Sequence, residues 1–102
     1  MGNSRKRKIT SRYEARVKVA KALAHPSRLL ILDTLSRRER CVYELRDLVG
    51  DDISTVSRHL SVLREAGIVE NEKRGLQVYY SLLTPCVLDI FRCIDATLRA
   101  KK

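Results

Sequence analysis

Three cysteines are the side chains of this sequence with the most distinctive chemistry, because thiolates bind soft metal ions and react with oxidants. They are Cys41, Cys86 and Cys93. A cluster of arginines precedes Cys41, and both Cys41 and Cys86 fall where helices are expected to start. Positive charge and a helix N-terminus both favour the thiolate. One hypothesis is therefore that the three thiols form a trigonal site for a thiophilic ion.

The spacing of the last two cysteines limits how such a site can be built. Cys86 and Cys93 are seven residues apart, which is about 10.5 Å along a regular helix. A disulfide needs Cα atoms within about 7 Å, and one ion with bonds of about 2.3 Å cannot easily hold both thiols. Three arrangements would still allow a shared ion site. Cys86 can precede the first regular turn of the helix, thiols of two protomers can converge, or Cys41 can join one of the pair. The alternative to a metal-binding role is that a cysteine is only a small buried hydrophobic side chain. This alternative is strongest for Cys93, which lies between two isoleucines.

A second group of residues suits DNA binding. The stretch from Ile53 to Arg64 contains no acid, and its expected solvent side carries small hydroxyls and arginines: Ser54, Thr55, Ser57, Arg58, Ser61 and Arg64. Small hydroxyls let a helix lie deep in the major groove and bond phosphates, while Arg58 can bond a guanine edge or a phosphate. Arg58 alone could be an ordinary surface arginine, but the whole set favours DNA binding.

Two further features flank this set. His59 falls next to the apolar stripe of the same segment, so we interpret it as a structural or phosphate-contacting residue and not as a metal ligand. Lys73 and Arg74, followed by Gly75, lie at the expected tip of a hairpin. Basic residues there suit a wing that rests on the adjacent backbone or minor groove.

The positions of these residues depend on five expected helices. Apolar residues at helical spacing, with Pro, Gly and capping residues between them, predict helices over 12–24, 27–35 after Pro26, 42–49 before Gly50, 53–66 after Asp52 or Ser54, and 85–98 after Thr84. The helix over 27–35 is apolar almost all round, which predicts a central position in the fold.

A hairpin is expected between the last two helices. Leu76, Val78, Tyr80 and Leu82 alternate with polar residues or Tyr79, so they should share one face of a strand. The segment "IVENE" is the expected partner strand, with "KRG" as the turn. The order is α-α-α-α-β-β-α, which makes the fold mainly α with a β-hairpin wing (α+β), a winged helix-turn-helix.

Composition restricts the class of protein. A chain of 102 residues with a net charge of +9 fits one domain. Residues 1–21 carry eight Lys or Arg and only one acid, Glu14, so we divide the chain into a basic arm of residues 1–11 and a domain of residues 12–100. The arm suits phosphate binding, and the alternative is a solvated, disordered tail. With no apolar run of 18 residues, no secretory signal and no disulfide framework, we expect a cytoplasmic protein without a membrane partner.

Longer segments resemble a known family. The segments "AHPSRLLILDTL" and "DISTVSRHLSVLREAGIVENEKRGLQVYYSL", with the last helix, are similar to the ArsR/SmtB family of winged-helix repressors over residues 15–98. The resemblance implies a homodimer paired through its first and last helices, which binds a palindromic operator and releases it when an inducer binds. The apolar stripe of the last helix supports pairing independently, because a chain this short gains stability by burying it.

The metal-binding positions of the family are incomplete in this sequence. The arsenic-sensing branch has Cys-Val-Cys-Asp/Glu-Leu before the recognition helix, and here Tyr43 replaces the second thiol and Arg46 the third. The zinc-type ligands are also missing, since no histidine follows His59. We expect As(III) or another thiophilic ion as inducer, with two alternatives: a thiol-redox or persulfide switch, or a DNA-binding module without an inducer. No catalytic constellation or organic cofactor site is present in the sequence, so we expect no enzyme.

Overall fold

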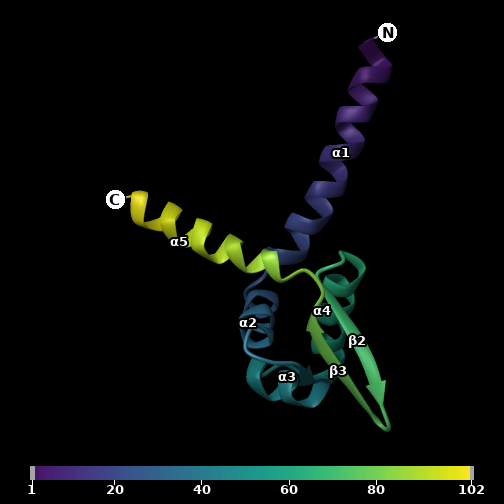
Figure 1. The fold of residues 1–102 in the computed structure, drawn as a ribbon, viewed down its shortest axis with the longest axis vertical. Coiled ribbons are helices and arrows are strands. Elements are labelled where there is room, and N and C mark those ends of the chain that lie inside the picture. The colour runs from purple at the N-terminus through teal and green to yellow at the C-terminus, as the bar shows by residue number, and fades with distance from the viewer. Residues whose placement is uncertain (1, 102) are drawn as a thin grey trace.

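Helices dominate the fold, and a small sheet forms the wing. The computed structural model describes the backbone of residues 2–101 and the side chains of residues 10–101. The elements are α1 (Gly2–Leu23), α2 (Pro26–Leu35), β1 (Arg40–Cys41), α3 (Val42–Val49), α4 (Ile53–Glu65), β2 (Val69–Arg74), β3 (Gln77–Leu82), the 3₁₀ turn η1 (Pro85–Leu88) and α5 (Asp89–Ala100) (Figure 1). The predicted winged helix-turn-helix is confirmed, with one additional short strand, β1.

The sheet is antiparallel with the order β1-β3-β2. Strands β2 and β3 pair from Val69 opposite Leu82 to Arg74 opposite Gln77, so the turn consists of Gly75 and Leu76. Gly75 has a φ of 64°, the left-handed conformation that such a two-residue turn requires. The expectation that Leu76 shares a strand face with Val78, Tyr80 and Leu82 is therefore wrong: it lies in the turn, and its side chain is 98% exposed.

The core lies between α2, α3, α4 and the sheet, and it is aliphatic as expected. Its fully buried members come from four elements and the segment before β2: Ile31, Leu32, Leu45, Val56, Leu60, Leu63, Ile68 and Val69. Burial of each such side chain stabilises the fold by about 1.5–3 kcal/mol. The central position predicted for α2 is confirmed by the complete burial of Ile31 and Leu32.

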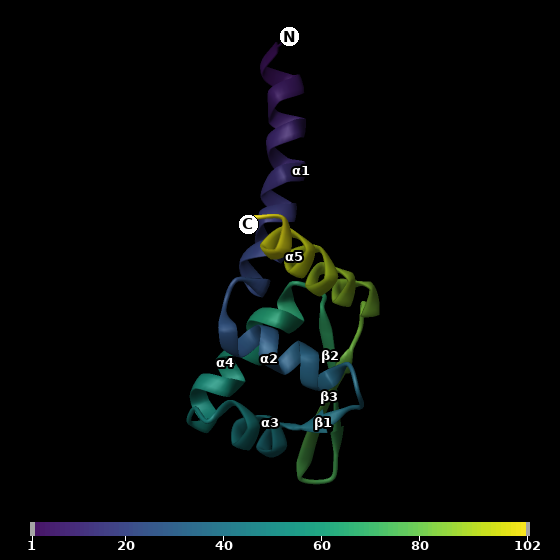
Figure 2. The same ribbon diagram turned by 90° about the vertical axis from the view of Figure 1, so that its left-hand side faces the viewer.

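Two helices project from this core. Figures 1 and 2 show α1 and α5 extending away from the α2–α4 body. The radius of gyration is 16.2 Å, above the about 13 Å expected of a compact chain of this length. Apolar side chains on both helices remain exposed, among them Tyr13 at 54% and Leu98 at 62%. The two helices therefore offer apolar surface that one copy of the chain does not cover.

The bounds of these helices differ from the sequence expectations. Helix α1 begins at Gly2 and not at residue 12, and α5 begins at Asp89 after η1. The division into an arm of residues 1–11 and a domain of residues 12–100 stays a prediction, and the side chains of residues 1–9 lie outside the described part. Across residues 2–101 no helix combines the length and the apolar character needed to span a bilayer.

Candidate nucleic-acid interface

Helices α3 and α4 form the helix-turn-helix. Helix α3 ends at Gly50, whose φ of 84° turns the chain. Asp52 then caps α4, and its Oδ1 accepts hydrogen bonds from the Thr55 N–H at 2.8 Å and the Ser54 hydroxyl at 3.0 Å. The Thr55 N–H contributes most to holding the pKa of Asp52 below its ordinary value. The start of α4 is thus fixed by a carboxylate that stabilises the helix dipole.

One face of α4 is anchored in the core, and the opposite face is exposed. Val56, Leu60 and Leu63 are completely buried. The other face carries most of the residues predicted to contact DNA: Ser54, Ser57, Arg58, Ser61 and Arg64 are exposed, and Thr55 is half-buried. Within residues 10–101, Arg58 and Arg64 form no ion pair. The structure therefore brings six of the predicted residues onto one helix with both guanidinium groups unengaged.

His59 lies away from this face. Its side chain is only 7% exposed, and its Nδ1 lies 3.0 Å from a guanidinium nitrogen of Arg28. The His25 ring lies 4.4 Å from the His59 ring, centroid to centroid. Burial, followed by His25 and Arg28, lowers the pKa of His59. This placement fits the structural alternative for His59, since the ring faces the junction of α1, α2 and α4.

The wing carries the two basic residues expected at its tip, but they are not equivalent. Arg74 donates to Glu39 Oε2 at 3.0 Å and also to Glu72, and its guanidinium lies 4.8 Å from the centre of the Tyr79 ring. The hydrogen bond from Arg74 holds the pKa of Glu39 below its ordinary value. Among the side chains described, Lys73 forms no ion pair. Sequence reasoning missed Glu39, which is distant from Arg74 in the chain.

The three thiols occupy separate elements. Cys41 is buried at the N-cap of α3, Cys86 is exposed in η1, and Cys93 is exposed on α5. No group of three His, Cys, Asp or Glu side chains able to hold a metal ion occurs in the part of the chain described. The expectation that Cys86 can precede the first regular helical turn is confirmed, because η1 comes before α5. Cys93 is exposed in one chain, so the alternative that it is a buried hydrophobic residue stays a prediction that depends on the pairing expected of the last helix.

The environment of Cys41 contains a carboxylate that offsets the nearby arginines. Its N–H donates to Glu44 Oε1 at 3.1 Å, and the other oxygen of Glu44 lies 2.9 Å from a guanidinium nitrogen of Arg38. Hydrogen bonds from Arg38 and then from the Cys41 N–H lower the pKa of Glu44. The positive charge that the sequence places beside Cys41 is thus partly neutralised by a residue one helical turn away.

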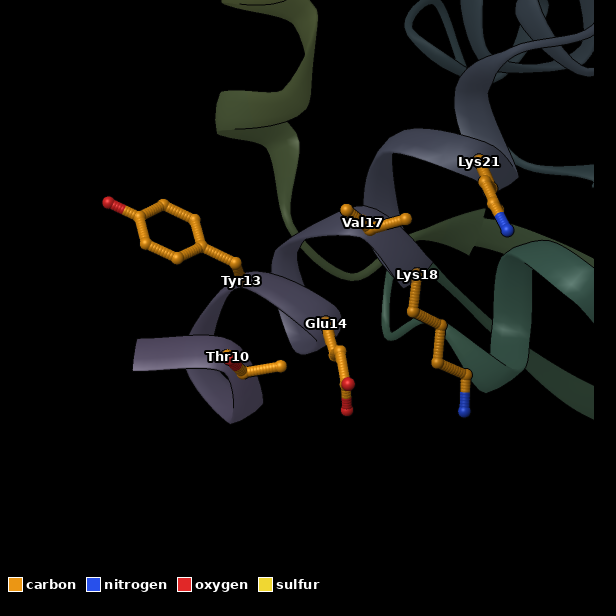
Figure 3. Close-up of a pocket in the computed structure, with 6 residues that line it drawn as sticks. All are labelled: Thr10, Tyr13, Glu14, Val17, Lys18 and Lys21. Atoms are coloured by element: carbon orange, nitrogen blue, oxygen red, sulfur yellow. The ribbon is translucent and has the colours of Figure 1, made fainter. Parts of the chain in front are cut away.

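Two hollows of the surface lie along the projecting helices. One is formed by α1 alone, from Thr10, Tyr13, Glu14, Val17, Lys18 and Lys21, and Figure 3 shows these side chains arising from one helix. Another joins α1 to α5 through Val19, Ala20, Leu23, Ile90 and Ile94, among others. The groove between α1 and α5 is lined mainly by aliphatic side chains, whereas the groove on α1 also carries Glu14 and two lysines.

Comparisons with known proteins agree with this architecture. Residues 25–71 match the family described as "Bacterial regulatory protein, arsR family". An uncharacterized HTH-type transcriptional regulator of Mycobacterium tuberculosis is 38% identical over 79 residues, 76% of this chain and 69% of that protein. The biofilm growth-associated repressor of Xylella fastidiosa is 44% identical over 62 residues, 61% of this chain and 54% of that protein.

A solved structure extends the match to the fold. The homodimeric winged helix-turn-helix DNA-binding domain of a possible ArsR-family regulator from Mycobacterium bovis has a TM-score of 0.78 and 29% identity, covering 90% of this chain and 85% of that one. The segment matched by the family model contains both helices of the helix-turn-helix, with the exposed hydroxyls and arginines of α4. The chain therefore belongs to the arsR family of bacterial regulatory proteins, and it is a winged helix-turn-helix transcriptional regulator and not an enzyme.

Proposed function

We propose that the chain is a homodimeric repressor that binds a palindromic operator through α4 and the wing. The observation that carries this proposal is the exposed face of α4, where Arg58 and Arg64 stand among small hydroxyls and no acid occurs from Ile53 to Arg64, while the opposite face is fixed in the core. Such a face can enter the major groove and place an arginine against guanine. The related repressor and the homodimeric DNA-binding domain described above support the same assignment.

The second copy is the proposed occupant of the apolar surface on α1 and α5. Val17 is 46% exposed, and Ile94 and Leu98 on α5 are 41% and 62% exposed. The two helices project on the side of the body away from the hairpin tip (Figure 1). Pairing there would bury this surface and leave two copies of α4 free. To enter successive major grooves, the two α4 helices of the pair would have to lie about 34 Å apart.

Replacement of Arg58 tests the DNA-binding proposal. A duplex selected by the protein from a random-sequence library serves as the operator, and a shuffled duplex of the same length is the reference. Arg58→Ala should weaken binding to the selected duplex by about tenfold or more, or about 1–3 kcal/mol, and leave the fold intact. Arg92→Ala is the matched control, since Arg92 is an exposed arginine of α5. Equal affinities of Arg58→Ala and the unaltered protein for the selected duplex would refute base recognition by Arg58.

We further propose that a thiophilic metalloid such as arsenite releases the repressor from DNA through the cysteine thiols. Support comes from Cys41 at the start of α3, the helix before the DNA-reading helix α4, and from the exposure of Cys86 and Cys93. Because no trio of ligands forms within the part of one chain described, such a site needs thiols from both copies or a rearrangement around η1.

Titration of the reduced protein with arsenite tests this inducer. Thiolate–arsenic absorbance and release of the selected duplex should appear together, and each Cys→Ser variant should weaken both. A redox or persulfide switch is the second candidate, favoured by two exposed thiols, and it predicts release by polysulfide without any metal. Unchanged regulation after replacement of all three cysteines by serine would exclude both mechanisms.

A further inference from the structure

Arg28 joins three helices through one side chain. It lies in the first turn of α2, and its Nε donates to the Ala22 carbonyl at 2.6 Å while one terminal nitrogen donates to the Lys21 carbonyl at 3.1 Å. Both carbonyls belong to the last turn of α1, where helix carbonyls lack intrahelical donors and a cation is favoured. The other terminal nitrogen lies 3.0 Å from His59 Nδ1 on α4. The end of α1, the start of α2 and the middle of α4 are therefore linked.

The contact with Arg28 fixes the protonation of His59. A guanidinium has only donors, so Nδ1 of His59 must accept and its single proton must lie on Nε2. A doubly protonated imidazole has no acceptor at all. The hydrogen bond and a charged His59 therefore exclude each other. The neighbouring His25 has a separate task, because its Nδ1 accepts the Ser27 N–H at 3.0 Å and caps α2.

The charged groups around His59 also favour its neutral form. Arg28 and His25 face it from α2 and its N-cap, Arg58 is adjacent on α4, and Asp51 faces it from the turn between α3 and α4. Burial lowers the pKa of His59 most, the basic neighbours lower it further, and Asp51 acts in the opposite direction. The pKa of His59 is thus lower in the folded protein than the ordinary histidine value of about 6.5. Protonation of His59 at lower pH therefore destabilises the folded state.

We infer that Arg28 is a positioning residue for DNA binding: through His59 it fixes α4 against the end of α1, and this link opens when His59 takes up a second proton. The inference rests on the proposed function of α4. His59 is adjacent to Arg58, so displacement of this turn of α4 moves the base-reading side chain. Because α1 belongs to the proposed dimer surface, the same link also fixes the position of α4 relative to its partner in the second copy.

The expected pH dependence has an unusual sign. Protonating histidines adds positive charge, so attraction to phosphates alone would tighten DNA binding as pH falls. Opening of the Arg28–His59 link predicts weaker binding to the selected duplex below about pH 6.5. The loss should be roughly tenfold, the effect of one charge-assisted hydrogen bond. Binding to shuffled DNA, which depends on phosphates, should not weaken.

The experiment compares four full-length proteins on the selected and shuffled duplexes between pH 5.5 and pH 8 at fixed salt. His59→Asn keeps an acceptor for Arg28 that does not titrate, so its selective affinity should be independent of pH. His25→Asn keeps the cap of α2 and should retain the loss of selective binding at low pH, but with the loss beginning at a higher pH because a basic neighbour of His59 is removed. Arg28→Lys keeps the charge but cannot bond all three acceptors, so it should weaken selective binding at pH 8 with unchanged helix content and dimer mass.

Several results would overturn the inference. A selective unaltered protein whose affinity is constant or rises as pH falls would do so, as would a His59→Asn variant with the original pH dependence. Nitrogen-detected NMR of the unaltered protein gives a second measurement, independent of variants: at pH 8 the His59 proton should lie on Nε2, and a proton on Nδ1 overturns the link. Equal binding of both duplexes by the unaltered protein at pH 8 would instead refute the proposed function, and this inference with it.

Discussion

Asp52 connects the stability of the reading helix to pH. Its carboxylate caps α4 through the Thr55 N–H, and its pKa is lowered by that hydrogen bond first. Asp52→Ala should reduce the free energy of unfolding by about 0.5–2 kcal/mol at pH 7, the usual effect of losing an N-cap. Chemical denaturation of the purified protein measures this change. Asp33→Ala, on an exposed position of α2, is the control and should change stability by less than about 0.5 kcal/mol.

The pH dependence of this cap follows from the direction of the pKa shift. Because the pKa of Asp52 is lower in the folded protein, its contribution is present above the ordinary Asp pKa of about 3.9 and is lost as pH falls through the folded value. Asp52→Asn keeps an acceptor without this titration. Its stability should resemble that of the unaltered protein near pH 7 and decline less steeply below pH 4. An equal decline in both proteins would assign the acid sensitivity to other groups.

Residues with nearby partners in the chain were predictable, and those with distant partners were not. Asp52 was one of two candidates for the cap because a cap bonds a residue three positions on. Arg28 and Arg74 bond partners 31 and 35 positions away, so no local pattern identifies His59 or Glu39 as their partners. The one sequence signal for Arg28 was a charged residue at the start of a mainly apolar helix.

At the scale of elements, carboxylates on and beside the wing compete with DNA phosphates for Arg74. Arg74 is engaged by Glu39 and Glu72, so a phosphate must replace these carboxylates before Arg74 can contact DNA. Glu39→Gln weakens this hold by removing one charge. We expect it to tighten DNA binding and to steepen the dependence of log Kd on log salt by up to about one phosphate contact. Affinities measured at four or more salt concentrations give this slope.

Glu70→Gln provides the matched control for the wing. Glu70 is exposed on β2 and loses the same charge, but it is not an ion-pair partner of Arg74. The general effect of one fewer negative charge is therefore the same in both variants. The difference between them reports the release of Arg74. If the two variants bind with the same salt slope, Arg74 does not contact phosphate.

The elements themselves were predictable where their periodicity was long enough. Helices α2, α3 and α4 follow apolar spacing and local caps, which need only neighbouring residues. Strand β1 has two residues, Arg40 and Cys41, which is too short for any alternation to show. The hairpin was predicted, but its turn was placed at "KRG" because "KRG" and "GL" both suit a turn. Only the pairing of Arg74 with Gln77 shows that the turn consists of Gly75 and Leu76.

At the scale of the whole molecule, a metal site built from the thiols of two copies would depend on how the copies pair. Cys86 and Cys93 lie in η1 and on α5, beside the surface proposed to pair two copies. The sequence could predict which helices carry exposed apolar stripes, since that follows from local spacing. It could not predict whether thiols of two chains converge, because this depends on the angle at which the copies pack. The same angle determines the separation of the two α4 helices.

The dimer surface can be tested by placing charge on each projecting helix. Val17→Glu on α1 and Ile94→Glu on α5 put a carboxylate on half-exposed positions that would be buried between two copies. An unpaired buried charge is strongly unfavourable, so both variants should lose dimer formation while keeping their helix content. Sedimentation or light scattering should then give the 11.7 kDa mass of one chain in place of about twice that value.

Leu48→Glu is the control for this prediction, because Leu48 is 47% exposed on α3, outside the proposed surface. It should remain dimeric. The monomeric variants should also bind the selected duplex far more weakly than the unaltered protein, although their α4 is unchanged. Two linked α4 helices bind one duplex more tightly than a single helix can. If Val17→Glu and Ile94→Glu remain dimers while Leu48→Glu dissociates, the copies pair through the α3 side. In that arrangement the spacing of the two α4 helices would no longer be set by α1 and α5.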